Sequence, residues 1–284
     1  MSASAPHGEL CVVATPIGHL DDITLRALNT LRGADLILAE DTRRTRILLD
    51  HHGIRKPLRA HHAHSPPEQL VAIVERIAGG ERIALVSDAG TPLVSDPGAQ
   101  LVCAVRDAGL HVTTAPGASA VLAALSIAGL RSDRFRFVGF MPRQGKRRRM
   151  AIEGVVSSTE ASVVFESPRR IAALLRDLSE HLGSRRLAVC RELTKLHEEV
   201  VRGTAAELAE VFAEGARGEI TLVVEAVDEG TKSPLDAPFD IDDAVTNGLA
   251  AGIHPRALAK EIAAEAGISG GEAYDLVLAA KKST

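Results

Sequence analysis

The segment from Ile83 to Gly98 constrains the fold of this chain more than any other. It opens with four apolar residues, Ile83 to Val86, a run typical of a strand buried on both faces of a parallel sheet. Small and turn-forming residues such as Gly90 and Pro97 then end the strand. Because ligands of open parallel sheets bind beyond the carboxyl ends of strands, Asp88 becomes a candidate site residue. An ordinary strand-to-helix connection would have the same composition, so the interpretation depends on the rest of the chain.

Apolar runs alternate with helical patterns through the first 117 residues, which predicts an α/β domain over residues 9–117 with a mostly parallel sheet. Strands are expected at residues 10–15, 36–39, 83–86 and 111–114. The first helix should bury Leu25, Leu28 and Leu31 on one face. A later helix should begin with a capping box made by Ser65 and Glu68.

The second half of the sequence predicts another α/β domain, over residues 118–228, with a mixed sheet. Strands are expected at residues 135–139, 162–166, 187–193, 198–202 and 219–226. A helix should begin with a capping box made by Thr204 and Glu207. Residues 229–239 read as a linker because they are rich in Gly, Ser and Pro. Residues 240–284 predict three helices with the rhythm of a helix-turn-helix module. A plain α-hairpin used for packing would have the same pattern.

The composition of the chain argues against several classes of protein. The 284 residues are 45% hydrophobic and 25% charged, as in folded domains, and only 2% aromatic, which argues against an aromatic platform for bases. Neither the three cysteines nor the histidines of residues 51–64 have partners at metal-site spacing, so no metal is expected. No signal peptide is recognised, and residues 118–130, the longest uncharged run, are too short to span a bilayer. A cytoplasmic protein that does not bind membranes is expected.

One segment is strongly basic although the chain carries a net charge of −4. Between Arg131 and Arg149 there are eight basic residues and one acid. Its densest part is expected to be a loop that contacts RNA phosphates, since Arg and Lys clusters give sequence-independent affinity for nucleic acid. A solvated surface is the alternative. The candidate RNA-binding residues are Arg143, Lys146, Arg147, Arg148 and Arg149.

Four expected strand ends carry small or turn-forming residues, at 15–18, 87–92, 116–120 and 165–168. Such loops let the main chain approach a ligand closely. No G-x-G-x-x-G pattern follows the first strand, which argues against a dinucleotide-type pocket. Charged residues at strand ends are candidate acid–base or ion-pairing groups: Glu40, Asp41, Glu166, Arg169, Glu192 and Lys195.

Together these loops resemble one family. Five segments carry the resemblance, namely 14–20 (Ala-Thr-Pro-Ile-Gly-His-Leu), 39–43 (Ala-Glu-Asp-Thr-Arg), 87–92 (Ser-Asp-Ala-Gly-Thr-Pro), 165–170 (Phe-Glu-Ser-Pro-Arg-Arg) and 191–195 (Arg-Glu-Leu-Thr-Lys). They are similar to the ribosomal RNA small subunit methyltransferase I family of the tetrapyrrole-methylase superfamily. His19 departs from that family, which usually has Asn there.

The resemblance implies two α/β domains of the class III S-adenosylmethionine methyltransferase type, with the cofactor in the cleft between them. It also implies a homodimer that methylates the 2′-oxygen of a cytidine in the decoding centre of 16S rRNA. Naked rRNA and the assembled 30S subunit both remain possible substrates. The cofactor residues carried over by motif are Pro16, Ile17, Gly18, Asp88, Ala89, Gly90, Thr91, Ser119, Ala120, Phe165, Glu192 and Leu193.

The residues do not decide which side chain is the general base. The candidates are Lys195, with a depressed pKa, Glu166 and Asp88. Two other functions remain as alternatives. A methylase of tetrapyrroles or other small molecules would share the fold, but it would not need the basic segment. A non-catalytic RNA-binding regulator would explain the terminal helices, but not the strand-end loops.

Overall fold

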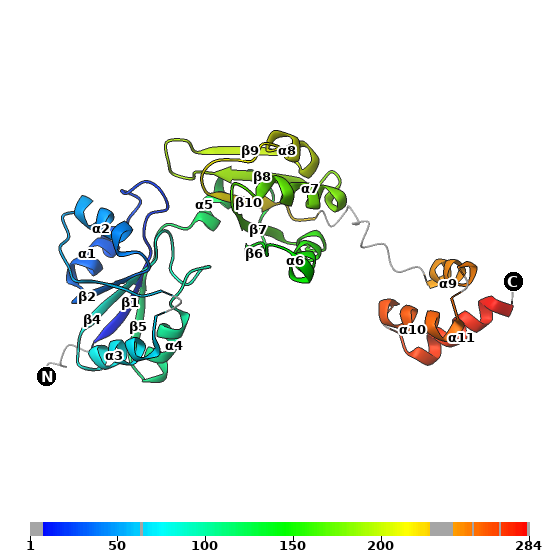
Figure 1. Cartoon of the computed structure of the whole chain (residues 1–284), viewed down its shortest axis with the longest axis horizontal. Coiled ribbons are helices and arrows are strands. Elements are labelled where there is room, and N and C mark those ends of the chain that lie inside the picture. The colour runs from blue at the N-terminus through cyan, green and yellow to red at the C-terminus, as the bar shows by residue number, and fades with distance from the viewer. Residues whose placement is uncertain (1–7, 63–64, 228–240, 252, 267, 283–284) are drawn as a thin grey trace. The chain divides into compact units, whose positions relative to one another are not determined.

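The computed structural model describes residues 8–62, 65–227, 241–251, 253–266 and 268–282 (Figure 1). It divides into two compact units, Met1–Val227 and Asp228–Thr284. The first unit contains two five-stranded sheets and the second contains three helices. Assigning residues 9–117 and 118–228 to separate domains stays a prediction, as does the 229–239 linker, which lies outside the described residues.

The first sheet is entirely parallel, as predicted. Its strands follow the order β3-β2-β4-β1-β5. The inner strands β2, β4 and β1 are apolar and almost wholly buried, which is why the sequence shows them as continuous hydrophobic runs. The edge strand β3 was not predicted, because only three residues form it and two are exposed. The strands are β1 (Glu9–Val13), β2 (Leu36–Ala39), β3 (Leu58–Ala60), β4 (Arg82–Val86) and β5 (His111–Ala115).

Helices cover both faces of this sheet. One face packs against α1 (Leu25–Gly33) and α2 (Thr42–His51), and the other against α3 (Pro67–Ala78) and α4 (Ala99–Asp107) (Figure 1). Along the chain, each of these helices lies between two successive strands of the sheet, so a helix makes each parallel crossover.

Two details of these helices differ from the sequence-based expectations. Leu25 is 80% exposed, and Ala27 joins Leu28 and Leu31 on the buried face instead. The N-cap of α3 is Pro66, and no side chain bonds the free N–H groups there. Pro67 disfavours helical dihedrals at the residue before it, so Pro66 stays extended and the helix begins one residue later than a Ser65 cap requires.

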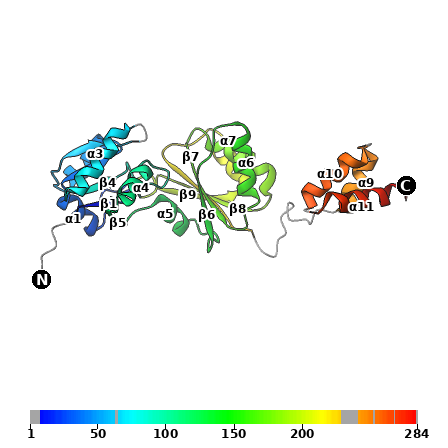
Figure 2. The same cartoon turned by 90° about the horizontal axis from the view of Figure 1, so that it is seen from below.

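The second sheet is mixed, as predicted, with the order β6-β7-β10-β8-β9. Only β6 and β7 run parallel, and β8 and β9 form a hairpin. The strands are β6 (Phe135–Phe140), β7 (Ala161–Glu166), β8 (Arg186–Arg191), β9 (Glu199–Thr204) and β10 (Ile220–Val224). One face packs against α6 (Gly145–Val156), α7 (Ile171–Leu182) and α8 (Ala205–Val211), the last opened by the predicted Thr204–Glu207 capping box. Figure 2 shows α6 and α7 side by side, and α5 (Ala120–Ile127) packs on the opposite face.

The basic residues Lys146 to Arg149 lie in the first turns of α6, and the expectation of a loop is wrong for them. Gly145, with a φ of +77°, turns the chain into the helix. Arg and Lys are good helix formers, so nothing in the run itself prevents the helix from starting there. Only Arg143 remains on the preceding loop.

The terminal unit consists of α9 (Ile241–Ala250), α10 (Pro255–Ala266) and α11 (Gly270–Lys282), which confirms the three predicted helices. They share a core of their own that includes Val245, Leu258, Ile262 and Val277. Gly248 is needed in this core, because a Cβ there would lie 2.3 Å from a Leu258 methyl carbon. No helix in the described residues is both long and apolar enough to cross a membrane.

Candidate functional site

A cavity of about 450 Å³ lies in the first compact unit, beyond the carboxyl ends of β2 and β4. The loops that follow the strands are bonded to one another around it. Thr15 and Gly90 exchange two backbone hydrogen bonds of 2.9 Å, which joins the loop after β1 to the loop after β4. The Thr91 hydroxyl donates to the Ala118 carbonyl at 3.2 Å, which attaches the loop after β5. The strand-end loops therefore form one connected wall.

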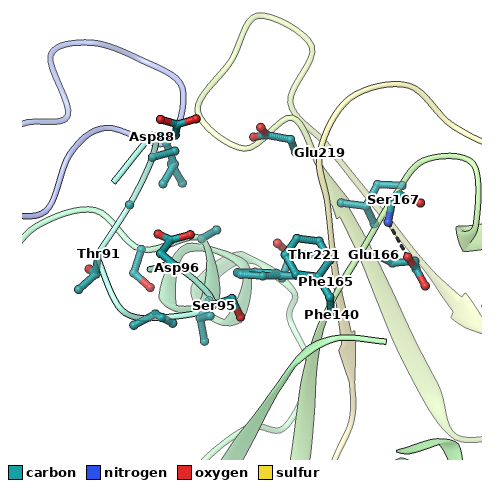
Figure 3. Close-up of a pocket in the computed structure, with 18 of the residues that line it drawn as sticks. Asp88, Thr91, Ser95, Asp96, Phe140, Phe165, Glu166, Ser167, Glu219 and Thr221 are labelled. Carbon is teal, nitrogen blue, oxygen red and sulfur yellow. Dashed lines mark hydrogen bonds between the residues drawn. The ribbon is translucent and has the colours of Figure 1, made fainter. Parts of the chain in front are cut away.

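Carboxylates gather on this wall. Glu40, Asp88 and Asp96 all line the cavity, and Figure 3 shows Asp88 and Asp96 on the same side of it. Burial raises the pKa of Asp96, and the neighbouring Asp88 adds to the rise. Burial also raises the pKa of Glu40, with further contributions from Asp88 and Asp96. Like charges confined in this way favour a ligand that brings positive charge.

Asp96 was not predicted as a site residue. It is held by an irregular loop in which two non-glycine residues, Leu93 and Ser95, adopt positive φ angles of 75° and 69°. Such backbone is costly and tends to occur where a site requires it. The sequence does give one signal, because Asp96 is the second acid in the same strand-end segment as Asp88.

The opposite wall comes from the second sheet. Figure 3 shows Phe165 and Thr221 facing the acidic wall, with Phe140 and Glu219 at the same side. Phe165 and Thr221 are paired in register on β7 and β10, so they project from the same face. The cavity is thus lined by Glu40, Asp88, Asp96 and main chain on one side, and by aromatic rings together with Glu219 on the other.

Eight of the twelve predicted cofactor residues line this cavity: Ile17, Asp88, Ala89, Gly90, Thr91, Ser119, Ala120 and Phe165. Pro16 and Gly18 instead border a neighbouring cavity of about 230 Å³, and Glu192 and Leu193 line neither. Leu193 is buried in the core under α5. Lining residues that the sequence analysis did not assign to the site are Arg44, Val94, Ser95, Asp96, Val121, Phe140, Gly218, Glu219, Ile220 and Thr221.

Gly18 serves packing between two loops. A Cβ there would lie 2.5 Å from the Lys195 side chain and 2.6 Å from the Thr194 hydroxyl. The next residue, His19, donates its backbone N–H to that same hydroxyl at 3.0 Å. This glycine therefore lets the loop after β1 lie against the loop between β8 and β9.

Lys195 is held in an ion-pair network. Its Nζ lies 2.9 Å from Glu192 Oε1 and 3.0 Å from Glu219 Oε2. Burial acts to lower the pKa of Lys195, but hydrogen bonds to these two carboxylates outweigh it and the net pKa is raised. The expectation of a depressed pKa is wrong. A lysine that stays charged has no lone pair with which to accept a proton.

Glu192 holds Glu219 in place. Its carboxylate accepts the Glu219 backbone N–H at 3.0 Å, and this bond, followed by the one from Lys195, lowers its pKa. The Glu192 backbone has a φ of +51°, and a Cβ on Gly218 would lie 2.3 Å from its side chain. Glu192 thus acts on the cavity through Glu219.

Glu166 borders the cavity, but its carboxylate is engaged elsewhere. The fully buried side chain forms an ion pair with Arg170 and accepts the Ser167 backbone N–H at 2.7 Å. In Figure 3 it points away from the centre of the cavity. Among the three bases proposed from sequence, Asp88 is the one whose carboxylate faces the cavity, and it also accepts the Asp41 backbone N–H at 2.9 Å.

The five candidate RNA-binding residues fall into two groups. Arg148 is 13% exposed, donates to Asp177 at 2.6 Å and also donates to the Pro142 carbonyl at 3.2 Å. Its role is to fix the start of α6. The others are exposed and form no salt bridge within the part of the chain that the structure describes: Arg143, Lys146, Arg147 and Arg149.

The histidine-rich segment has one acidic partner that the sequence did not reveal. Asp21 lies 3.1 Å from His51 Nε2, and candidate ligand atoms of Asp21, His51 and His52 lie within 4.8 Å of one another. His52 Nε2 also lies 3.1 Å from the Leu20 carbonyl oxygen. Hydrogen bonding from His51 lowers the pKa of the exposed Asp21 carboxyl. This group is a cluster in which Asp21 and His51 are exposed and His52 is half-buried.

Residues 9–209 match the model of the family described as Tetrapyrrole (Corrin/Porphyrin) Methylases. The chain superposes on uroporphyrin-III-C-methyltransferase from Thermus thermophilus with a TM-score of 0.57 and 20% identity, over 77% of this chain and 94% of that one. Diphthine synthase gives a TM-score of 0.60 and 17% identity, over 76% of this chain and 89% of that one. The fold is that of the tetrapyrrole methylases.

Named relatives place the chain in one branch of the tetrapyrrole methylases. A protein of Mycobacterium tuberculosis named ribosomal RNA small subunit methyltransferase I is 44% identical over 98% of this chain and 97% of its own length. A relative of the same name from Halalkalibacterium halodurans is 38% identical over 95% and 94% of the two chains. The chain belongs to the ribosomal RNA small subunit methyltransferase I family, a branch of the tetrapyrrole methylases. It is a methyltransferase that uses S-adenosylmethionine.

The cavity fits this cofactor. Its volume lies in the range of small-molecule sites, and its small residues leave main chain open to hydrogen bonding. The carboxylates of Asp88 and Asp96 complement the positive charges of the sulfonium and the amino group. Gly90, with a φ of +75°, keeps the main chain beside them free of a side chain.

Proposed function

We propose that this enzyme methylates the 2′-hydroxyl of a cytidine in the decoding centre of 16S rRNA, with the 30S subunit as substrate. The observation that favours RNA over a tetrapyrrole is the group of four exposed basic residues, Arg143, Lys146, Arg147 and Arg149. They begin three residues after Phe140, which lines the cavity. A phosphate backbone passing this position would meet cations that form no salt bridge with any carboxylate in the described residues.

The chemistry requires alignment and a proton acceptor. Bound S-adenosylmethionine supplies a methyl group on a positively charged sulfur, and two rigid walls that hold the ribose in line with it supply much of the rate. The 2′-hydroxyl must lose its proton as the new bond forms. Glu40 and Asp96 both have a raised pKa, which makes each a better proton acceptor than an ordinary carboxylate. We take Asp96 as the candidate, because Figure 3 shows it across the cavity from Phe165 and Thr221.

The test is methyl transfer from labelled S-adenosylmethionine to three substrates: 30S subunits from a strain lacking this protein, deproteinised 16S rRNA, and a uroporphyrinogen. We expect label in the 30S subunits, and ribose mapping should place it on a 2′-oxygen of a decoding-centre cytidine. Label in the tetrapyrrole alone would contradict the proposal. Cofactor binding without transfer to any of the three substrates would favour a regulator.

We also propose that the enzyme acts in the cytoplasm as a homodimer, as the family resemblance implies. Light scattering at several protein concentrations tests the oligomeric state, and a mass of 30.0 kDa throughout would contradict it.

A further inference from the structure

Phe140 is an unusual residue in this chain. The protein has only six phenylalanines, one tyrosine and no tryptophan, yet Phe140 is 59% exposed while it lines the cavity. A single exposed apolar side chain is ordinary on a protein surface. What sets Phe140 apart is how the backbone directs it.

A β-bulge turns Phe140 toward the cavity. In the parallel pairing of β6 with β7, Phe137 lies opposite Val163 and Gly139 lies opposite Val164, so Val138 is left without a partner. In a regular strand, residues three apart project from opposite faces. Here the extra residue places Phe137 and Phe140 on the same face, where both contact Phe165 edge to face, with ring centroids 4.9 Å and 5.5 Å from it. Bulges beside active sites often redirect a side chain in this way.

The main chain around Phe140 is fixed. The Met141 backbone N–H donates to the Phe165 carbonyl at 3.4 Å, and Arg170 donates to the Met141 carbonyl at 3.0 Å. Arg148 donates to the Pro142 carbonyl and is itself paired with Asp177. The ring is thus exposed, but its backbone is held from both sides. A contact surface that is already ordered loses little conformational entropy on binding.

The exposed ring and the exposed cations follow one another along the chain. A ribonucleotide offers an apolar base face and an anionic phosphate, and aromatic stacking with basic contacts is the usual recognition of unpaired strands. A ribose whose 2′-oxygen reaches the cavity places its own base within a few ångströms of the cavity wall. Composition argues against an aromatic platform, but one correctly placed ring is enough to hold one base.

We propose that Phe140 stacks on the base of the nucleotide being methylated, while Arg143, Lys146 and Arg147 contact the phosphates that flank it. This inference rests on the proposed function, since it assumes an RNA substrate. The target nucleotide must then be unpaired or turned out of its helix when it binds. Phe140 positions substrate and takes no part in proton transfer.

The test compares Phe140→Leu, which keeps an apolar side chain but removes the ring, with Phe140→Trp, which restores one. Phe140→Leu should lower kcat/KM for RNA methylation by roughly tenfold to a hundredfold, the range for loss of one stacked base. Phe140→Trp should recover most of it. Any loss of affinity for S-adenosylmethionine, measured by calorimetry, should be much smaller than the loss of RNA methylation. Phe135→Leu is the matched control, because Phe135 is 41% exposed on the same strand and does not line the cavity.

A direct readout uses an RNA oligonucleotide with pyrrolo-cytidine at the target position, whose fluorescence is quenched on stacking. Wild-type protein and Phe140→Trp should quench it, and Phe140→Leu should not. Wild-type RNA kinetics in Phe140→Leu, or a loss of cofactor affinity as large as the loss of RNA activity, would overturn the inference. If the wild-type protein itself transfers no methyl group to RNA, the proposed function fails, and that result precedes any variant.

Discussion

Asp96 and Lys195 show that the surroundings of a charged side chain, and not its place after a strand, decide whether its charge is stabilised. Both are charged residues after a strand of a parallel or mixed sheet, and both lie near a cavity. Lys195 meets two carboxylates, so its charge is stabilised. Asp96 is half-buried near a second acid, so its charge is destabilised. The sequence left the base open between Lys195, Glu166 and Asp88, and we propose Asp96 instead because Lys195 stays charged.

We predict that Asp96→Asn stabilises the free protein and inactivates it. The raised folded-state pKa means that the stability contributed by Asp96 is present below its ordinary pKa of 3.8 and is lost as the pH rises through the raised value. At neutral pH, removing this charge should therefore increase the free energy of unfolding, by up to about 1 kcal/mol. The single-turnover methylation rate should fall by about 10² or more.

The pH dependence provides the check. The wild-type rate should fall as the pH drops through the raised pKa of Asp96, and the residual rate of Asp96→Asn should not follow that profile. Denaturant unfolding and single-turnover assays measure both effects. Asp107→Asn, at an exposed helix end, is the control. A destabilised Asp96→Asn protein that keeps the wild-type rate would contradict this role.

At the scale of elements, the basic residues around the start of α6 have two different roles, although they form one basic run in the sequence. Five cations occur within seven residues, but Arg148 faces Asp177 on α7 and the other four face solvent. The separation follows from the helical repeat, since side chains one apart on a helix point in different directions. One cation holds the helix against its neighbour, and the rest remain available for phosphate.

We predict that Arg147→Ala combined with Arg149→Ala weakens RNA binding without loss of stability. If both contact phosphates of a single strand, the slope of log K against log salt should become less steep by about 1.4, since each contact contributes about 0.7. Arg148→Ala should instead lower the free energy of unfolding by about 1–3 kcal/mol, the value of a hydrogen-bonded pair between charged groups, and leave the slope unchanged. Filter binding across a salt series and thermal unfolding separate the cases. A steep slope retained in the double variant would leave these residues as a solvated surface.

At the scale of the whole molecule, the described residues form two units with separate cores. All residues that line the cavity belong to the first. The terminal helices were a candidate RNA-docking module, but residues 241–282 contain six acidic and four basic residues. Electrostatic attraction to phosphate is therefore concentrated in the first unit.

We predict that a chain truncated after Val227 keeps its unfolding temperature and its affinity for S-adenosylmethionine, because its cores and cavity are complete. The salt slope of RNA binding should also stay the same, because the removed helices carry no excess of positive charge. Calorimetry and the salt series used for α6 measure these quantities. Loss of cofactor binding on truncation would show that the terminal unit is part of the site.

The sequence by itself determined most of the elements and most of the strand-end segments that form the site, but not the edge strand β3 or the part that residues 218–221 take in the site. Buried strands and amphipathic helices depend on local periodicity, and strand-end loops on Gly, Pro and small residues, so residues 83–98 could be recognised without coordinates. Only the tertiary structure decided what the side chains in those segments do. Arg148 depends on Asp177, 29 residues away, and Lys195 depends on Glu219, 24 residues away. The direction of Phe140 depends on a bulge in its pairing with β7. Such pairings are set by packing between distant segments, and no local pattern encodes them.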